Sequence, residues 1–326
     1  MNLKLSARAL AAALFAMLLV AGLCGRAAAD TAVSACGTLS AAGNYFLTAN
    51  LTATSDCLVI AADNVAIDLK GKKITGNGTG AAVTDDGSFL NFAVIANGTI
   101  SNFATGINLL HSGQAIISNV SSSKNTSDGI FIGECCNTLS SVTTNDNGGT
   151  GIFIGSDHSS LSKITANGNA GGGVHITGSR NALVASTESN NKGTGAEIDG
   201  CCSFVIASQT QKNTGDGVEM GDGDDGVIKS TSARNGADGM DLPGGDNMVT
   251  ESKSTSNGGT GVDLGNNSDD RWGIFSGVQA SKNKGDGVDM GCRGSTASLK
   301  AQKNSGTNLV QTDVDGPCAN VNLNAP

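Results

Sequence analysis

The chain has 326 residues, of which 38% are hydrophobic, 3% aromatic and 15% charged, with 47 Gly, 3 Pro and a formal net charge of −9. So few large apolar side chains argue against a thick conventional core, while the low charge and the scarcity of Pro argue against disorder. The 29 acidic residues against 20 basic ones exclude a nucleic acid partner, because no basic stripe is present. A repetitive fold that buries small residues in thin layers remains.

Residues 1–29 have the pattern of a secretory signal peptide. Lys4 and Arg8 precede an apolar run over residues 9–23, and three alanines at 27–29 provide a small-residue cleavage site. The run is short for a membrane span, and no other segment reaches about 20 apolar residues, so we expect no membrane span. The sequence therefore predicts secretion to the periplasm or the extracellular space. Without this leader, 17 basic residues face 29 acidic ones, a net charge of −12.

Eight cysteines remain after the leader, and an exported chain with an even number of cysteines is a candidate for disulfides. We expect Cys36 to pair with Cys57 in an N-terminal cap over residues 30–60. Likewise, we expect Cys292 to pair with Cys318, beside a C-terminal cap over residues 313–326. Spacing alone leaves the connectivity open.

Between the caps, residues 61–312 carry an internal repeat. A short motif, Gly-apolar-x-apolar, recurs every 22 residues, and an Asn lies four residues before each of these glycines. Such a constant period is the signature of a repeat architecture. The glycines in strict register are Gly129, Gly151, Gly173, Gly195, Gly217, Gly239 and Gly261, and a further copy begins at Gly287 after an insertion.

The apolar residues of each motif alternate, as in Ile130 and Ile132, which predicts a short strand buried on one side. A second apolar position, such as Leu139, follows ten residues after each Gly, so each coil needs at least two strands. No helix fits within this period. The pattern predicts an all-β solenoid of about eleven coils, with parallel strands roughly 4.8 Å apart. The chirality of parallel connections makes it right-handed.

The segment Leu58 to Gly76, LVIAADNVAIDLKGKKITG, followed by the Asn and Gly ladders, resembles right-handed parallel β-helix repeat proteins of the pectin-lyase-like superfamily. The resemblance extends from about Cys36 to Leu309. It implies a single-stranded right-handed parallel β-helix. It is much less specific for activity, because the superfamily includes pectate lyases, polygalacturonases, alginate lyases and epimerases, phage tailspikes and adhesins.

The catalytic signatures of these enzymes are not carried over. Of the polygalacturonase set, only a paired Asp224-Asp225 is present, and His175 stands in GGGVHI rather than between two glycines. The mature chain lacks the Arg-rich context of pectate lyases, and the Asp-Pro-His-Asp signature of mannuronan epimerases is missing from the sequence. The resemblance therefore assigns no catalytic residue.

The strongest candidate site follows from register. The residue two positions after each motif Gly points outward, and reading it coil by coil gives what we call the outward column: Phe131, Phe153, His175, Glu197, Glu219, Asp241, Asp263 and Asp289. Like charges on neighbouring rungs repel, so such carboxylates take up protons or bind a cation such as Ca²⁺. We expect Glu197, Glu219, Asp241 and Asp263 to act as acid/base groups, and Asp241, Asp263 and Asp289 as Ca²⁺ ligands. The alternative is a polar face that only keeps the sheet soluble.

Aromatic groups complete the candidate site. Phe131, Phe153 and His175 form one end of the outward column, and Trp272, the only Trp, lies in an insertion over residues 266–273. Aromatic rings stack on sugar rings, so these four residues are predicted ligand-binding groups. The net charge of −12 favours a neutral or cationic ligand over a polyuronate, unless cations bridge the like charges.

Three functional hypotheses remain open. The first is binding of an extracellular polysaccharide, with its processing by a hydrolase or lyase reaction as an extension. The second is a non-catalytic structural or adhesive rod. The third is periplasmic copper handling by Cys135, Cys136 and His158. These three residues and Asp157 share one edge of two successive coils and together are a candidate soft metal site. A second vicinal pair, Cys201-Cys202, occupies the same register three coils later, and its role stays open.

Overall fold

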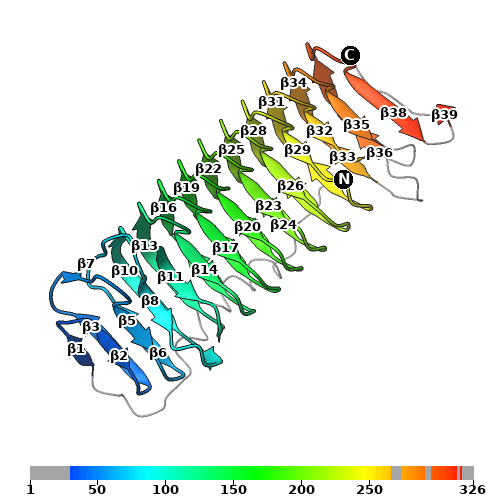
Figure 1. The fold of residues 1–326 in the computed structure, drawn as a ribbon. Coiled ribbons are helices and arrows are strands. Elements are labelled where there is room, and N and C mark those ends of the chain that lie inside the picture. The colour runs from blue at the N-terminus through cyan, green and yellow to red at the C-terminus, as the bar shows by residue number, and fades with distance from the viewer. Residues whose placement is uncertain (1–29, 266–272, 291–294, 314–315, 318–326) are drawn as a thin grey trace.

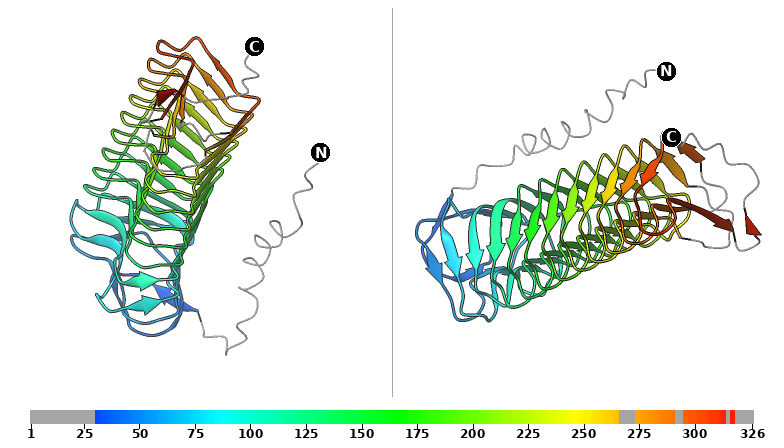
Figure 2. Two further views of the ribbon diagram at one scale, coloured as in Figure 1. Left: turned by 90° about the vertical axis from the view of Figure 1, so that its right-hand side faces the viewer. Right: turned by 90° about the horizontal axis from the view of Figure 1, so that it is seen from above.

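The computed structural model describes residues 30–265, 273–290, 295–313 and 316–317. The predicted leader, Trp272, Cys292 and Cys318 lie outside the described residues. Figure 1 shows a rod of stacked coils running from the N-terminal to the C-terminal end, and the two views of Figure 2 show the coils in register along it. The described part is an all-β parallel solenoid of about 12 turns with a repeat of ~22 residues and no helix, as the sequence predicts.

One wall of the rod is a sheet of 14 strands, parallel except at its last pairing. Its strands are β2 (Gly37–Leu39), β5 (Leu58–Ile60), β8 (Ala81–Asp85), β11 (Thr105–Leu109), β14 (Ile130–Ile132), β17 (Ile152–Ile154), β20 (Val174–Ile176), β23 (Ala196–Ile198), β26 (Val218–Met220), β29 (Met240–Asp241), β32 (Val262–Asp263), β35 (Val288–Met290), β38 (Leu309–Asp313) and β39 (Gly316–Pro317).

The remaining walls form a sheet of 23 strands, to which most coils contribute two. Its strands are β1 (Thr31–Val33), β3 (Gly43–Leu47), β4 (Leu51–Thr52), β6 (Val65–Asp68), β7 (Lys73–Thr75), β10 (Val94–Ser101), β13 (Ile116–Ser123), β15 (Thr138–Ser140), β16 (Thr143–Asn145), β18 (Ser160–Ser162), β19 (Thr165–Asn167), β21 (Ala182–Val184), β22 (Thr187–Ser189), β24 (Phe204–Ile206), β25 (Gln209–Gln211), β27 (Gly226–Ile228), β28 (Thr231–Ala233), β30 (Met248–Thr250), β31 (Lys253–Thr255), β33 (Ile274–Ser276), β34 (Gln279–Ser281), β36 (Ser295–Ala297) and β37 (Lys300–Gln302). A small third sheet pairs β9 (Leu90–Asn91) with β12 (Ser112–Gly113).

The alternation in the sequence explains these strands. In β14 the side chains of Ile130 and Ile132 are fully buried, while Phe131 between them is half-buried on the outside. The second apolar position, Leu139, is fully buried in β15. Each coil thus contributes inward rungs that stack on the rungs of the next coil, and these stacks make up the core.

Sharp corners separate the strands of a coil. Ser141, which joins β15 to β16, has a φ of 54°, and Asp146, which follows β16, also has a φ of 54°. This left-handed backbone costs a non-glycine residue roughly 1 kcal/mol. The corners are held by bonds between coils, because the N–H of Ser141 donates to the carbonyl of Ser162 on the next coil.

The asparagines that precede the motif glycines by four residues form a buried ladder along the rod. The amide of each Asn donates to the side-chain oxygen of the next, for example from Asn147 to Asn169 at 2.9 Å and from Asn169 to Asn191 at 3.0 Å. The same acceptor oxygens also receive a backbone N–H, as Asn169 does from Asn147 at 3.1 Å. Side chains here replace the backbone ladder at a turn, which leaves few buried polar groups unpaired.

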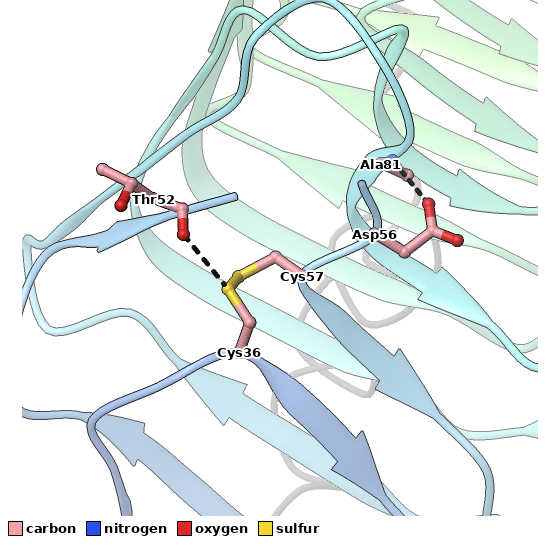
Figure 3. Close-up of a disulfide and its surroundings, with 5 residues drawn as sticks. All are labelled: Cys36, Thr52, Asp56, Cys57 and Ala81. Carbon is pink, nitrogen blue, oxygen red and sulfur yellow. Dashed lines mark hydrogen bonds between the residues drawn. A yellow bond between two sulfur atoms is a disulfide. The ribbon is translucent and has the colours of Figure 1, made fainter. Parts of the chain in front are cut away.

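The N-terminal end of the rod contains the expected disulfide. Cys36 and Cys57 are joined with an S–S distance of 2.02 Å, and beside them the Asp56 carboxylate accepts the N–H of Ala81 at 2.7 Å (Figure 3). Disulfides are typical of proteins outside the reducing cytoplasm. The boundaries of the caps at residues 30–60 and 313–326 stay predictions. Across the described residues, none forms a helix long and apolar enough to cross a membrane.

Candidate functional site

The structure places the outward column on one continuous face of the 14-stranded sheet. Strand pairing is parallel and in register, so Phe131 pairs with Phe153, and the column continues rung by rung to Asp263 and Asp289. Every member is half-buried rather than fully solvated. Neighbouring rungs of a parallel sheet lie about 4.8 Å apart, so each member of the column is the neighbour of the next one along the rod.

Two phenylalanines form the aromatic end of the outward column. The rings of Phe131 and Phe153 are stacked with centroids 5.0 Å apart and planes 8° from parallel. The imidazole of His175 meets Phe153 edge-on at 5.1 Å and 82°. Register alone forces this stacking, because identical side chains sit on successive rungs of β14 and β17. The result is a partly exposed aromatic surface of fixed orientation.

His175 connects the aromatic end to the carboxylates. Its Nε2 lies 2.9 Å from Oδ2 of Asp199 and 3.7 Å from Oε1 of Glu197. Glu197 is the next member of the outward column. Asp199 comes two residues after Glu197, directly after the end of β23, and so lies on the same side of the sheet. Sequence reasoning did not single out Asp199, although its position two residues beyond Glu197 on an alternating strand carries that signal.

The central carboxylates of the outward column have raised pKa values. Partial burial, followed by the charge of Glu197, raises the pKa of Glu219, whose Oε2 accepts a hydrogen bond from Thr194 Oγ1 at 3.2 Å. Burial, with the charge of Asp263 second, raises the pKa of Asp241 to about 7. At neutral pH the outward column therefore presents a carboxyl group close to its own pKa, beside carboxylates on adjacent rungs.

The predicted Ca²⁺ ligands Asp241, Asp263 and Asp289 are neighbours in register. However, Oδ1 of Asp263 accepts the N–H of Gly265 at 2.7 Å, so that oxygen serves the backbone. Within the described residues, the group of side chains that brings three ligand atoms within 4.8 Å of one another is a different one, His175, Glu197 and Asp199. The three predicted Ca²⁺ ligands thus lie in one row, but their carboxylate oxygens do not form a group within 4.8 Å of one another.

The aspartates that directly precede the motif glycines form hydrogen bonds between successive coils. Oδ1 of Asp216 accepts the N–H of Asp238 at 2.6 Å, and Oδ1 of Asp238 in turn accepts the N–H of Thr260. Burial raises the pKa of both groups. These aspartates tie one coil to the next along the edge of the outward column and add negative potential to it.

Among the described residues, the vicinal cysteines Cys135 and Cys136 are not gathered with Asp157 and His158 into one cluster of ligand atoms. Asp157 accepts the N–H of Ser179 at 2.7 Å, so its carboxylate is turned toward the following coil. A side-chain hydrogen bond with Cys135, together with burial, raises the pKa of Cys136 to about 11, so the Cys136 thiol is protonated at neutral pH. Within the part of the chain that the structure describes, these residues bring no three ligand atoms within 4.8 Å.

The fold of this chain also occurs in proteins of known structure. It is similar to the A-module of the Azotobacter vinelandii mannuronan C-5 epimerase AlgE6, with a TM-score of 0.56 and 10% identity over 87% of this chain and 88% of that one. It is also similar to the Dettilon tailspike protein, with a TM-score of 0.55 and 12% identity over 83% of this chain and 60% of that one. At such identities the likeness concerns the fold.

Two further findings complete the comparison. No curated protein sequence matches the chain at a significant level. The family model for the right-handed β-helix region matches residues 39–188 and 172–313, which together span most of the described rod. This match agrees with the Gly-apolar-x-apolar period, the parallel in-register pairing and the Asn ladder. The chain belongs to the right-handed β-helix family.

Proposed function

We propose that this protein binds an extracellular carbohydrate along the outward column. The observation that carries the proposal is the in-register alignment of stacked Phe131 and Phe153, His175 and five acids on one half-buried face. Stacked rings offer an apolar surface to the face of a sugar, and carboxylates accept hydrogen bonds from its hydroxyls. A rigid rung spacing suits a ligand with a repeating backbone.

The electrostatics favour a neutral or amino-sugar polymer over a polyuronate. The mature chain carries a net charge of −12, and the outward column concentrates acids next to Asp216 and Asp238. A similar fold occurs in an epimerase named for mannuronan, which is a polyanion. We propose that this chain differs from that epimerase in the charge of the glycan that it binds.

A glycan array with the mature protein tests which class of glycan is bound. We expect saturable binding to neutral or amino-sugar glycans and none to polyuronates, and array-wide silence would contradict the proposal.

A hydrolytic reaction on the bound glycan is a second proposal, favoured by the pKa of about 7 at Asp241. Protonated Asp241 would donate its proton to the glycosidic oxygen while the C–O bond breaks. The Glu219 carboxylate on the adjacent rung would attack the anomeric carbon, and water would then release the sugar. Rungs about 4.8 Å apart place the two groups near the ~5–5.5 Å separation of retaining glycosidases. Glu197 and Asp263 would flank this pair.

This second proposal predicts a pH dependence with a definite sign. A general acid works while protonated, so turnover should be present below pH 7 and fall as the pH rises through about 7. Asp241→Asn should reduce the release of reducing ends from array-positive glycans by about 100-fold or more. Asp146→Asn, the same change at an exposed corner, should leave turnover unaltered. Full turnover in Asp241→Asn would eliminate hydrolysis by this pair and leave the binding proposal standing.

A further inference from the structure

Among the residues that the structure describes, one cluster combines a nitrogen ligand with two carboxylates. Nε2 of His175 faces Oε1 of Glu197 and Oδ2 of Asp199, and the three ligand atoms all lie within 4.8 Å of one another. His175 lies in β20 and Glu197 in the adjacent β23, whose register is fixed by parallel pairing, and Asp199 is the residue that directly follows β23. The paired strands therefore set the positions of two of the three ligands.

The spacing of these atoms fits a small divalent cation. Bonds of about 2.0–2.2 Å in a tetrahedral arrangement place neighbouring ligand atoms roughly 3.3 Å apart. The observed separations from His175 Nε2, 2.9 Å and 3.7 Å, fall on either side of that value. Small side-chain rotations would bring both carboxylates to bonding distance, with no movement of the sheet.

The surroundings of the cluster also favour a bound divalent cation. Phe153 packs edge-on against the His175 ring and limits its rotation, which preserves the aim of Nε2. The side chains of His175 and Glu197 are 23% and 30% exposed, so they are partly shielded, whereas Asp199 is 47% exposed and faces solvent. A cation held here would keep an open position toward water, and its charge of +2 would balance the two carboxylates.

We propose that His175, Glu197 and Asp199 form a binding site for a divalent cation of the Zn²⁺ class. The imidazole selects Zn²⁺, Co²⁺ or Ni²⁺ over Ca²⁺, because Ca²⁺ requires six to eight oxygen ligands and three side chains with one nitrogen do not supply them. The site includes two members of the outward column, His175 and Glu197, at the point where its aromatic end meets its acids. The metal proposal does not require that the column binds carbohydrate.

The experiment is a calorimetric titration with Zn²⁺ alone, combined with the visible absorption of the Co²⁺ form. Thiols bind the same metals, so the four cysteines that are free in the described part of the chain are replaced by Ser in every sample: Cys135, Cys136, Cys201 and Cys202. We expect one equivalent of Zn²⁺, displaced little by excess Ca²⁺. His175→Gln should weaken binding by about 100-fold or more, and Asp199→Asn by at least about 10-fold.

The matched control is His158→Gln, which removes an exposed imidazole from another edge of the rod and should leave Zn²⁺ affinity unchanged. Far-UV circular dichroism and thermal melting identify any variant that fails to fold. If stoichiometric binding survives in folded His175→Gln, or if the parent binds no Zn²⁺ at millimolar concentration, the proposal is overturned. Glycan binding is measured separately after chelation, so a failure of the metal site remains distinct from a failure of the carbohydrate proposal.

Discussion

At the scale of single residues, Asp225 shows how a sequence motif and a structural role can coincide. The Asp224-Asp225 pair looks like a fragment of a polygalacturonase signature, yet Asp225 is 1% exposed and belongs to a second polar ladder. Its Oδ1 accepts the N–H of Ser203 at 2.8 Å, and its own N–H donates to Asn247 at 3.0 Å. Other coils place a neutral Asn or Ser at this position, as at Asn181 and Ser203. Burial of the carboxyl group raises the pKa of Asp225 to about 7.

This position predicts a stabilising substitution. The folded-state pKa of Asp225 lies above its ordinary value, so the folded protein favours the protonated carboxyl group. Its contribution to the free energy of unfolding is therefore fully present at low pH and is lost as the pH rises from about 4 through about 7. Asp225→Asn removes that penalty. We expect the free energy of unfolding to rise at pH 8 by up to about 4 kcal/mol, with little change at pH 4. Chemical denaturation at both pH values measures it, with Asp146→Asn as the exposed control.

At the scale of elements, the periodic strands were predictable and one strand of each coil was not. The first two strands of a coil bury Ile, Val, Leu or Met, so their alternation is visible in the sequence. The third strand buries Thr144 in β16, Ala166 in β19 and fully buried Glu188 in β22. Small or polar inward residues leave no apolar alternation to read, and tertiary stacking rather than local pattern creates this strand.

The Asn ladder gives the element-scale prediction. Asn169 is fully buried, accepts from the backbone and side-chain amides of Asn147, and donates to Asn191 and to the carbonyl of Thr144. Asn169→Ala leaves several of these groups unpaired, and we expect a loss of about 2–4 kcal/mol in the free energy of unfolding. Asn44→Ala, at an exposed position of β3, should cost under about 0.5 kcal/mol. Equal losses of unfolding free energy in Asn169→Ala and Asn44→Ala, measured by urea denaturation, would contradict the idea that the ladder stabilises the fold.

At the scale of the whole molecule, the rod converts a sequence period into a straight row of side chains. That conversion made the order of the outward column predictable, since one residue per coil projects at the same place. The contact between His175 and Asp199 was harder to foresee, because it joins different rungs and depends on side-chain direction. Partial shielding of the column was also unforeseen, since it depends on how neighbouring rungs crowd one another and not on the period.

The central claim is that the outward column binds a glycan, and calorimetry with an array-positive glycan tests it most directly. Phe153→Ala removes one of the two stacked rings, and we expect binding to weaken by about 10-fold or more, as for a base stacked on an aromatic ring. Phe204→Ala removes a ring that is 37% exposed on the other sheet and should leave affinity unchanged. Equal affinity of Phe153→Ala and the parent protein would contradict the account.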